Sequence, residues 1–171
     1  MADLGDGSYL NPILRYGFSR FLRDAASLGV AGLLLTDLPA GSDPALEQEV
    51  AASPLDLIRL LAPTTPPARL AVAAAEARGF LYLVSRLGVT GASTSVAADL
   101  EASIARVRAV SSLPIAVGFG LSTAAQVSQV ARLAERVVVG SALVDRLGRD
   151  GVAGARVLLT ELRDALDAVE R

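Results

Sequence analysis

Five continuous runs of apolar residues divide this chain, and several of them end in glycine. Continuous runs, unlike alternating ones, are typical of parallel strands that are covered on both faces. Helical patterns separate the runs at a spacing of about 25–30 residues, so the chain is interpreted as about five βα units. This alternation predicts an α/β fold on a parallel sheet. The expected strands are 31–36, 57–62, 80–84, 113–117 and 136–139.

Helices are expected between these strands, and two of them carry clear start signals. Asp43 before Pro44 matches an N-cap residue followed by proline at the first helical position. Thr123 and Gln126 have the spacing of a capping box. Residues 1–12 are predicted to be irregular, since they contain glycine and proline and show no apolar period. The expected helices are 18–28, 43–52, 65–79, 99–110, 123–133 and 152–169.

The chain length limits the architecture. With 171 residues, of which 52% are hydrophobic, the chain can form one well-packed core, and a single domain over 1–171 is expected. A closed (β/α)₈ TIM barrel usually needs about 200 residues or more. Two alternatives therefore stay open at this point: an open, doubly wound sheet, or a TIM barrel that lacks some of its units.

Net charge and hydropathy exclude several classes of partner. The net charge is −2, so no strong attraction to nucleic acid or to a membrane surface is expected. No apolar stretch approaches the roughly 20 residues that a membrane span needs. The first residues are acidic and do not resemble a signal peptide. Cysteine is absent, and a cytoplasmic location is the default expectation.

Two further residue types are absent. The chain has no histidine and no lysine, so all its basic residues are arginines. These absences exclude a Ser-His-Asp triad, a histidine metal cluster, a Schiff-base lysine and a P-loop lysine. Neither a metal site nor a cofactor is expected. Chemistry must therefore come from carboxylates, tyrosines, hydroxyl groups, arginines and backbone groups.

Glycine-bearing segments follow three of the expected strands. They are Gly88-Val89-Thr90-Gly91, Gly118-Phe119-Gly120 and Gly140-Ser141-Ala142. Glycine at a strand end lets backbone N–H groups approach a ligand closely, and N–H groups at a helix start favour an anion. In a βα barrel, phosphate commonly binds after strands seven and eight, beside a short extra helix. The last two segments suit that place, which predicts binding of a phosphate ester.

Seven motifs resemble the alpha chain of tryptophan synthase in their order and approximate spacing. The resemblance covers residues from about 8 to the C-terminus. The motifs are Tyr9-Leu10-Asn11-Pro12-Ile13, Asp37-Leu38-Pro39, Leu61-Ala62-Pro63-Thr64-Thr65, Tyr82-Leu83-Val84-Ser85-Arg86, Gly88-Val89-Thr90-Gly91, Gly118-Phe119-Gly120 and Gly140-Ser141-Ala142. The resemblance implies a (β/α)₈ barrel, here a partial one, and favours that alternative over the open sheet.

The resemblance also implies an activity and a partner. The family cleaves indole-3-glycerol phosphate to indole and glyceraldehyde 3-phosphate by a retro-aldol reaction, which makes it a lyase of tryptophan biosynthesis. Its partner is the tryptophan synthase beta chain, with which it forms a heterotetramer, and the beta chain receives the indole. No cofactor is implied for the alpha chain.

Site residues follow from the resemblance, position by position. Gly91, Gly120, Gly140 and Ser141 would hold the phosphate, with Thr90 and Gly118 in the same substrate-binding motifs. Tyr82 would line the pocket as its remaining proton-capable residue, although a phenol with a pKa near ~10 is a poor base. Phe119 and Tyr9 would lie beside the substrate. Asp37 and Leu38 fall in the loop that faces the beta chain in the family.

One departure from the family concerns catalysis. The family begins with about three further strands before the Tyr9 motif, and its catalytic glutamate ends one of them. None of the seven glutamates here ends an expected strand. Asp3 corresponds to the family's second carboxylate, in what resembles a shortened remnant of that motif. Little or no lyase activity is therefore expected of this chain alone.

Two other hypotheses and one physical consequence remain. The first is a non-catalytic module that binds phosphate or the beta chain. The second is another phosphate-sugar barrel enzyme, which ranks last because the paired carboxylates or metal-binding histidines it needs are absent. A parallel sheet with exposed edges is also prone to self-association.

Overall fold

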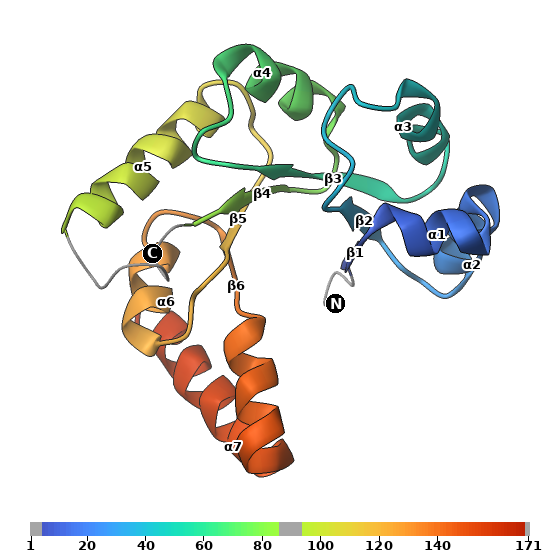
Figure 1. The fold of residues 1–171 in the computed structure, drawn as a ribbon. Coiled ribbons are helices and arrows are strands. Elements are labelled where there is room, and N and C mark those ends of the chain that lie inside the picture. The colour runs from blue at the N-terminus through green and yellow to red at the C-terminus, as the bar shows by residue number, and fades with distance from the viewer. Residues whose placement is uncertain (1–4, 86–93, 170–171) are drawn as a thin grey trace. The chain divides into compact units, whose positions relative to one another are not determined.

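The computed structural model describes residues 5–85 and 94–169, which contain six strands and seven helices (Figure 1). The strand order is β1-β2-β3-β4-β5-β6. These residues form two compact units, the N-terminal unit (Met1–Tyr82 with Val110–Leu113) and the C-terminal unit (Leu83–Ala109 with Pro114–Arg171). The elements are β1 (Gly5–Ser8), α1 (Leu10–Tyr16), α2 (Phe18–Ser27), β2 (Gly32–Leu35), α3 (Pro44–Ala51), β3 (Asp56–Leu61), α4 (Pro67–Glu76), β4 (Leu81–Val84), α5 (Thr94–Arg108), β5 (Ile115–Gly118), α6 (Ala124–Ala131), β6 (Arg136–Val138) and α7 (Ser141–Asp167).

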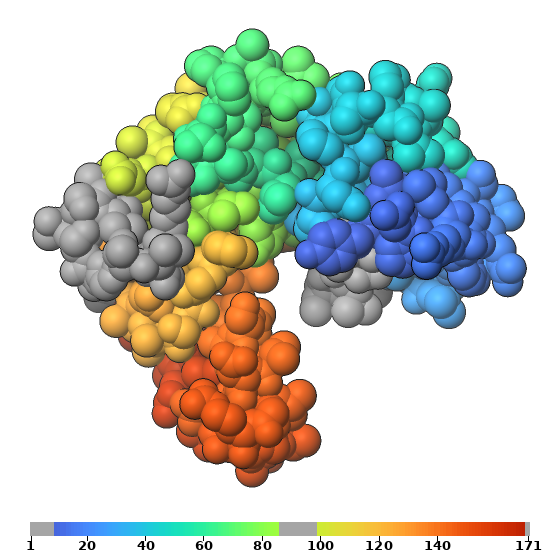
Figure 2. All heavy atoms as spheres, viewed as in Figure 1, coloured from blue at the N-terminus to red at the C-terminus, as the bar shows by residue number. Residues whose placement is uncertain are grey.

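Parallel strand pairs organise the N-terminal unit. β1 pairs with β2 from Gly5 opposite Gly32, and β2 pairs with β3 from Gly32 opposite Asp56. Helices α1 and α2 lie against each other in the space-filling view (blue in Figure 2). Their apolar side chains share one core with the strands, which buries the face of the sheet that the helices cover. That core contains Ile13, Phe18, Leu22, Ala25, Leu33, Leu35, Leu38, Val50, Leu55 and Leu57.

The prediction that residues 1–12 are irregular is wrong for most of that segment. Gly5–Ser8 forms β1, because its backbone pairs with β2 and this pairing needs no apolar pattern. Leu10–Tyr16 forms α1 although it contains Pro12. Pro12 occupies the first turn of α1, where a backbone N–H has no partner inside the helix, so the missing N–H costs little.

The helix start signals are confirmed. The Asp43 carboxylate caps α3 by accepting a hydrogen bond from the Leu46 N–H at 3.1 Å. At α6, the Thr123 side chain accepts from the Gln126 N–H and the Gln126 side chain accepts from the Thr123 N–H, as in a capping box. Helix α5 begins at Thr94 rather than at residue 99.

In the C-terminal unit, β5 and β6 pair in parallel, with Ala116 opposite Arg136 and Gly118 opposite Val138. Helices α6 and α7 lie side by side (Figure 1), and their contact is built on a small apolar core. The Ser128 hydroxyl adds a hydrogen bond to the Ala165 carbonyl at 3.1 Å. The core consists of Val127, Leu158 and Leu162.

Helix α7 is longer than the predicted 152–169 segment. It begins at Ser141 and is interrupted at Gly151, whose φ of 65° and ψ of −166° are not helical. This combination of angles is essentially restricted to glycine. The chain therefore has two helical segments here, and residues 141–150 form the one that the sequence prediction missed.

Burial of the strands is less uniform than continuous apolar runs predict. β2 and β5 are buried throughout, as expected for strands covered on both faces. In β4, buried and half-buried residues alternate, and β6 has no fully buried residue. In β3, Leu60 remains 39% exposed. The five strands expected from the sequence are confirmed as β2 to β6, and β1 is a sixth.

Candidate functional site

A hollow of about 250 Å³ opens in the C-terminal unit where β5 and β6 are followed by α6 and α7. Its lining contains three residues of the glycine-bearing segments that the sequence singles out, Gly120, Ser141 and Ala142. We call it the glycine hollow. Its lining residues are Gly120, Leu121, Ser122, Ser141, Ala142, Asp145, Arg146, Arg149 and Leu158.

The backbone enters this hollow through two consecutive residues with positive φ. Phe119 has a φ of 87° and Gly120 a φ of 73°. A bulky residue at positive φ costs about 1–3 kcal/mol and persists only where the surroundings hold it, typically at functional sites. The Phe119 side chain is 63% exposed, so burial of the ring does not offset this cost.

Ser85, directly after β4, holds the strained segment in place. Its N–H donates to the Gly118 carbonyl at 2.7 Å, and its hydroxyl donates to the Phe119 carbonyl at 2.8 Å. Ser85 is fully buried. Sequence analysis named Ser85 only as part of the Tyr82-Leu83-Val84-Ser85-Arg86 motif and gave it no role, although a lone hydroxyl at the end of an apolar strand was the available signal.

The start of α7 forms another wall. Gly140 is the N-cap residue and Ser141 the first helical residue, so the first backbone N–H groups of α7 have no partner inside the helix. Arg146 forms an ion pair with Asp150 at 3.6 Å, and the Arg149 Nε donates to the Asp145 carbonyl at 3.4 Å. Hydroxyls, free N–H groups and guanidinium groups around one hollow can bind a small anion. Sequence analysis missed both arginines because it assigned no element to residues 141–150.

The N-terminal unit contains the loop predicted to face a partner. The Asp37 carboxylate accepts a hydrogen bond from the Leu10 N–H, at the start of α1, at 2.7 Å. Leu38 is buried, and its carbonyl accepts from Arg59 Nη1 at 3.3 Å. Tyr9 is the N-cap residue of α1 and is 68% exposed.

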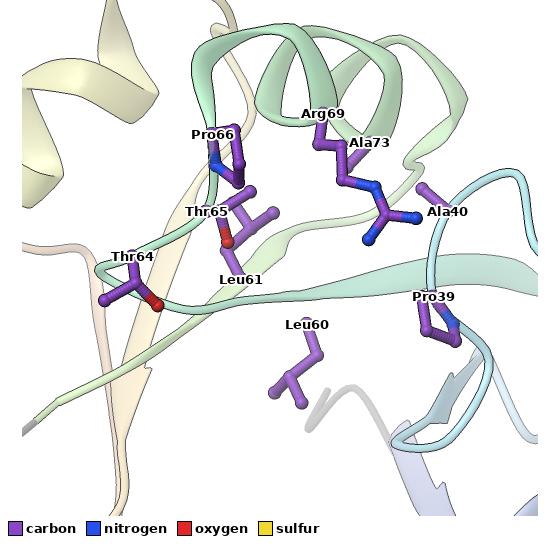
Figure 3. Close-up of a pocket in the computed structure, with 9 residues that line it drawn as sticks. All are labelled: Pro39, Ala40, Leu60, Leu61, Thr64, Thr65, Pro66, Arg69 and Ala73. Carbon is purple, nitrogen blue, oxygen red and sulfur yellow. The ribbon is translucent and has the colours of Figure 1, made fainter.

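A second pocket, of about 260 Å³, lies beside that loop in the same unit. In Figure 3, the Arg69 side chain extends from α4 towards the loop residues Pro39 and Ala40. Thr64, Thr65 and Pro66, from the turn between β3 and α4, line another side together with Leu60, Leu61 and Ala73.

The structure locates Tyr82 and the described glutamates, which the sequence analysis considered for proton transfer. Tyr82 lies on β4 and is half-buried, and burial raises the pKa of its phenol above the ordinary value, which makes it a still poorer base at neutral pH. Among residues 5–85 and 94–169, no glutamate stands at the carboxyl end of a strand. Within the same residues, no cluster of three or more acidic side chains is suited to a metal ion, and no helix is long and apolar enough to cross a membrane.

The predicted site residues thus divide between the units. Gly118, Phe119, Gly120, Gly140 and Ser141 lie in the C-terminal unit, at or directly beside the glycine hollow. The N-terminal unit contains Tyr9, Asp37, Leu38 and Tyr82. Asp3, Thr90 and Gly91 lie outside the described residues, and their roles stay predictions.

Consecutive parallel strands joined by helices, with glycine-bearing strand ends that open into a hollow, define a βα-barrel type of protein. The sequence model of one family, described as tryptophan synthase alpha chain, matches residues 7–168. The chain belongs to the tryptophan synthase alpha chain family.

Individual relatives agree with this assignment. The chain is 48% identical over 162 residues to a tryptophan synthase alpha chain from Chloroflexus aurantiacus, covering 92% of this chain and 61% of the relative. Among solved structures, tryptophan synthase from M. tuberculosis in an aminoacrylate-bound form matches with a TM-score of 0.82 and 36% identity, over 94% of this chain and 60% of that one. A tryptophan synthase alpha chain from Legionella pneumophila subsp. pneumophila matches with a TM-score of 0.83 and 33% identity, over 96% and 63%. The chain therefore spans about three fifths of the length of these relatives.

Proposed function

We propose that this chain is an alpha-type subunit of tryptophan synthase that binds the phosphate end of indole-3-glycerol phosphate in the glycine hollow. The observation that carries the proposal is the composition of the hollow. Gly120, Ser141 and the start of α7 line it together with Arg146 and Arg149, whose two positive charges exceed the one negative charge of Asp145. Free N–H groups at a helix start and nearby guanidinium groups both favour a phosphate dianion.

The proposed reaction is the retro-aldol cleavage of the bond between the indole ring and the glycerol chain. It requires a proton delivered to the indole ring carbon and a proton removed from the glycerol hydroxyl, which becomes the aldehyde. A carboxyl group within hydrogen-bond reach contributes about 10²–10⁴-fold to such proton transfers. The described glutamates lie in helices or precede β6, and the raised pKa of Tyr82 opposes its use as a base. We therefore propose substrate binding with little or no indole release by the 171-residue chain.

The test combines calorimetry and an indole-release assay. We expect glycerol 3-phosphate to bind the purified chain and Arg146→Gln to weaken that binding several-fold. Arg156→Gln is the matched control, because Arg156 is exposed on the part of α7 beyond Gly151 and does not line the hollow. Absence of phosphate binding would contradict the proposal. Indole release at the rate of a full-length relative would contradict the expected loss of turnover.

Association with the tryptophan synthase beta chain is the second part of the proposal. The loop at Asp37 and Leu38 resembles the loop that faces the beta chain in the family. Here hydrogen bonds to Asp37 and Leu38 hold this loop in place, and the next residues, Pro39 and Ala40, line a pocket. A chain that binds and activates a beta chain without releasing indole would be a non-catalytic binding module. Titration of the chain into a beta chain, with binding and beta-chain turnover recorded, distinguishes the two roles.

A single domain over 1–171 and a location in the cytoplasm both remain proposals. Cooperative thermal unfolding that is superimposable by far-ultraviolet and near-ultraviolet circular dichroism would support one domain. Fractionation of cells that express the chain would test the location.

A further inference from the structure

A buried ionic cluster underlies the loop that follows β2. Arg59, in the middle of β3, has a side chain that is only 3% exposed. Its Nη2 atom lies 3.0 Å from Glu47 Oε2, on α3, and 2.6 Å from Glu76 Oε2, on α4. We call these three residues the Arg59 cluster. It contains two carboxylates for one guanidinium group.

This cluster is a poor means of stabilising the fold. The free energy that charged groups lose on dehydration is about as large as their mutual attraction in a buried ion pair. Apolar residues of similar volume therefore often stabilise a fold equally well or better. In the described part of the chain, the Arg59 Nε atom is buried without a hydrogen-bond partner, which adds to that cost. Its neighbours on the same strand face, Leu57 and Leu61, are buried and apolar. The presence of a charged residue at this place therefore indicates a role other than stabilising the core.

The cluster makes two contacts with the backbone of one loop. Arg59 Nη1 donates to the Leu38 carbonyl at 3.3 Å. Glu47 Oε1 accepts from the Gly41 N–H at 2.9 Å. These two bonds fix the loop on both sides of Pro39 and Ala40, which line the pocket in Figure 3. Asp37, one residue before Leu38, is fixed separately by the Leu10 N–H.

We infer that Glu47 and Arg59 are positioning residues that hold the Leu38–Gly41 loop in the conformation in which it docks on the tryptophan synthase beta chain. The inference rests on the proposed association with that chain. Neither side chain reaches the partner itself, because both are buried beneath the loop. They act by presenting Pro39 and Ala40 in one fixed geometry, which lowers the ordering cost of binding.

The structure supplies a matched pair of variants. The Gly41 N–H lies 2.9 Å from Glu47 Oε1 and 3.3 Å from Glu47 Oε2, and Oε2 also pairs with Arg59. In Glu47→Gln an amide nitrogen, which cannot accept a hydrogen bond, replaces one of these oxygens, so the shorter bond from Gly41 or the contact with Arg59 is lost. Glu76 touches the same Arg59 Nη2, and its one amide oxygen in Glu76→Gln can still accept that bond. Both variants remove one negative charge from the cluster, but only Glu47→Gln alters a side chain that bonds directly to the loop.

The test measures beta-chain affinity by calorimetry, amide hydrogen exchange at Gly41, and thermal unfolding for wild type and both variants. We expect Glu47→Gln to weaken beta-chain binding about tenfold or more and to speed exchange at Gly41, with Glu76→Gln within about twofold of wild type. Equal effects of both variants, in proportion to their loss of thermal stability, would overturn the inference. If Glu47→Gln does not fold, Glu47→Asp takes its place, since its shorter carboxylate keeps the charge.

Wild-type binding separates this inference from the proposed function. A wild-type chain that does not bind the beta chain overturns the proposed association, and with it the docking role of the loop. In that case, the exchange of the Gly41 N–H still decides whether Glu47 positions the loop. A wild-type chain that binds, with an affinity unchanged by Glu47→Gln, overturns the inference alone.

Discussion

The Leu38–Gly41 loop and the glycine hollow occupy the same place in their βα units, directly after a strand, but they are held by different forces. Buried charged side chains fix the loop in the N-terminal unit. In the C-terminal unit, the hollow is shaped by backbone conformation, with positive φ at Phe119 and Gly120 and two hydrogen bonds from Ser85. The loop should therefore be sensitive to changes of charge, and the hollow to changes of backbone preference.

The largest change in stability is expected for the Arg59 cluster. Arg59→Ala leaves Glu47 buried without its guanidinium partner, so we expect the free energy of unfolding to fall by about 3–5 kcal/mol. Urea denaturation followed by circular dichroism measures this change. Arg69→Ala, at an exposed position beside the same loop, should stay within about 0.5 kcal/mol of wild type. Similar losses in both variants would show that the buried charge has no special importance.

A change of backbone preference should break the hollow. Gly120→Val puts a β-branched residue at a φ of 73°, so we expect a loss of about 1–2 kcal/mol in unfolding free energy. Binding of glycerol 3-phosphate should fall further than this destabilisation explains, because the new side chain enters the hollow. Calorimetry with the folded variant measures that affinity. Unchanged affinity would show that Gly120 does not border the phosphate site.

Relief of the backbone strain at Phe119 should have the opposite effect on stability. Phe119→Gly removes the strain of a bulky residue at a φ of 87°, and its mostly exposed ring gives up little burial. We expect the unfolding free energy to rise by up to about 1 kcal/mol. Urea denaturation checks the sign of the change. A clear loss of stability would mean that the exposed ring makes contacts that outweigh the strain.

The smallest expected effect depends on pH and tests a charged contact in the C-terminal unit. Burial opposes ionisation of Glu135, but hydrogen bonds from the Ile115 N–H and from Arg108 outweigh it and lower the pKa of this carboxyl. A lowered pKa in the folded state means that the stabilisation is present above the unfolded value and is lost as pH falls through the folded value.

Glu135→Gln should therefore be less stable than wild type at pH 7, by up to about 1 kcal/mol, because the ion pair is partly exposed. The difference should shrink as the pH falls below about 4. Urea midpoints of both proteins at pH 7, 5 and 3.5 measure it. A difference that does not depend on pH would contradict this origin.

The sequence predicted what local chemistry determines. Continuous apolar runs located β2 to β6, and short-range capping contacts located the starts of α3 and α6. β1 was missed because its order comes from backbone pairing with β2, which leaves no side-chain pattern. Helix propensity and apolar periodicity alone did not locate residues 141–150, so Arg146 and Arg149 were missed with them.

Of the candidate site, the sequence could indicate only the glycine and hydroxyl residues. Gly120 and Ser141, which both line the hollow, were singled out because glycine and hydroxyl residues after a strand suit a phosphate. The positive φ of Phe119 was not predictable, since aromatic residues avoid that region. Arg59 gave no signal either, as its carboxylate partners come from two separate helices and only the folded chain brings them together.

The break in α7 at Gly151 has a consequence for chirality. A substituted side chain there would meet open space, so crowding does not exclude other residues. Inverting the signs of its φ and ψ gives about −65° and +166°, which is an ordinary extended conformation for an L-residue. A D-alanine introduced at this position by chemical synthesis would therefore adopt these backbone angles without strain, whereas L-alanine would not. The handedness of the residue at 151 thus decides whether the break in α7 is strained.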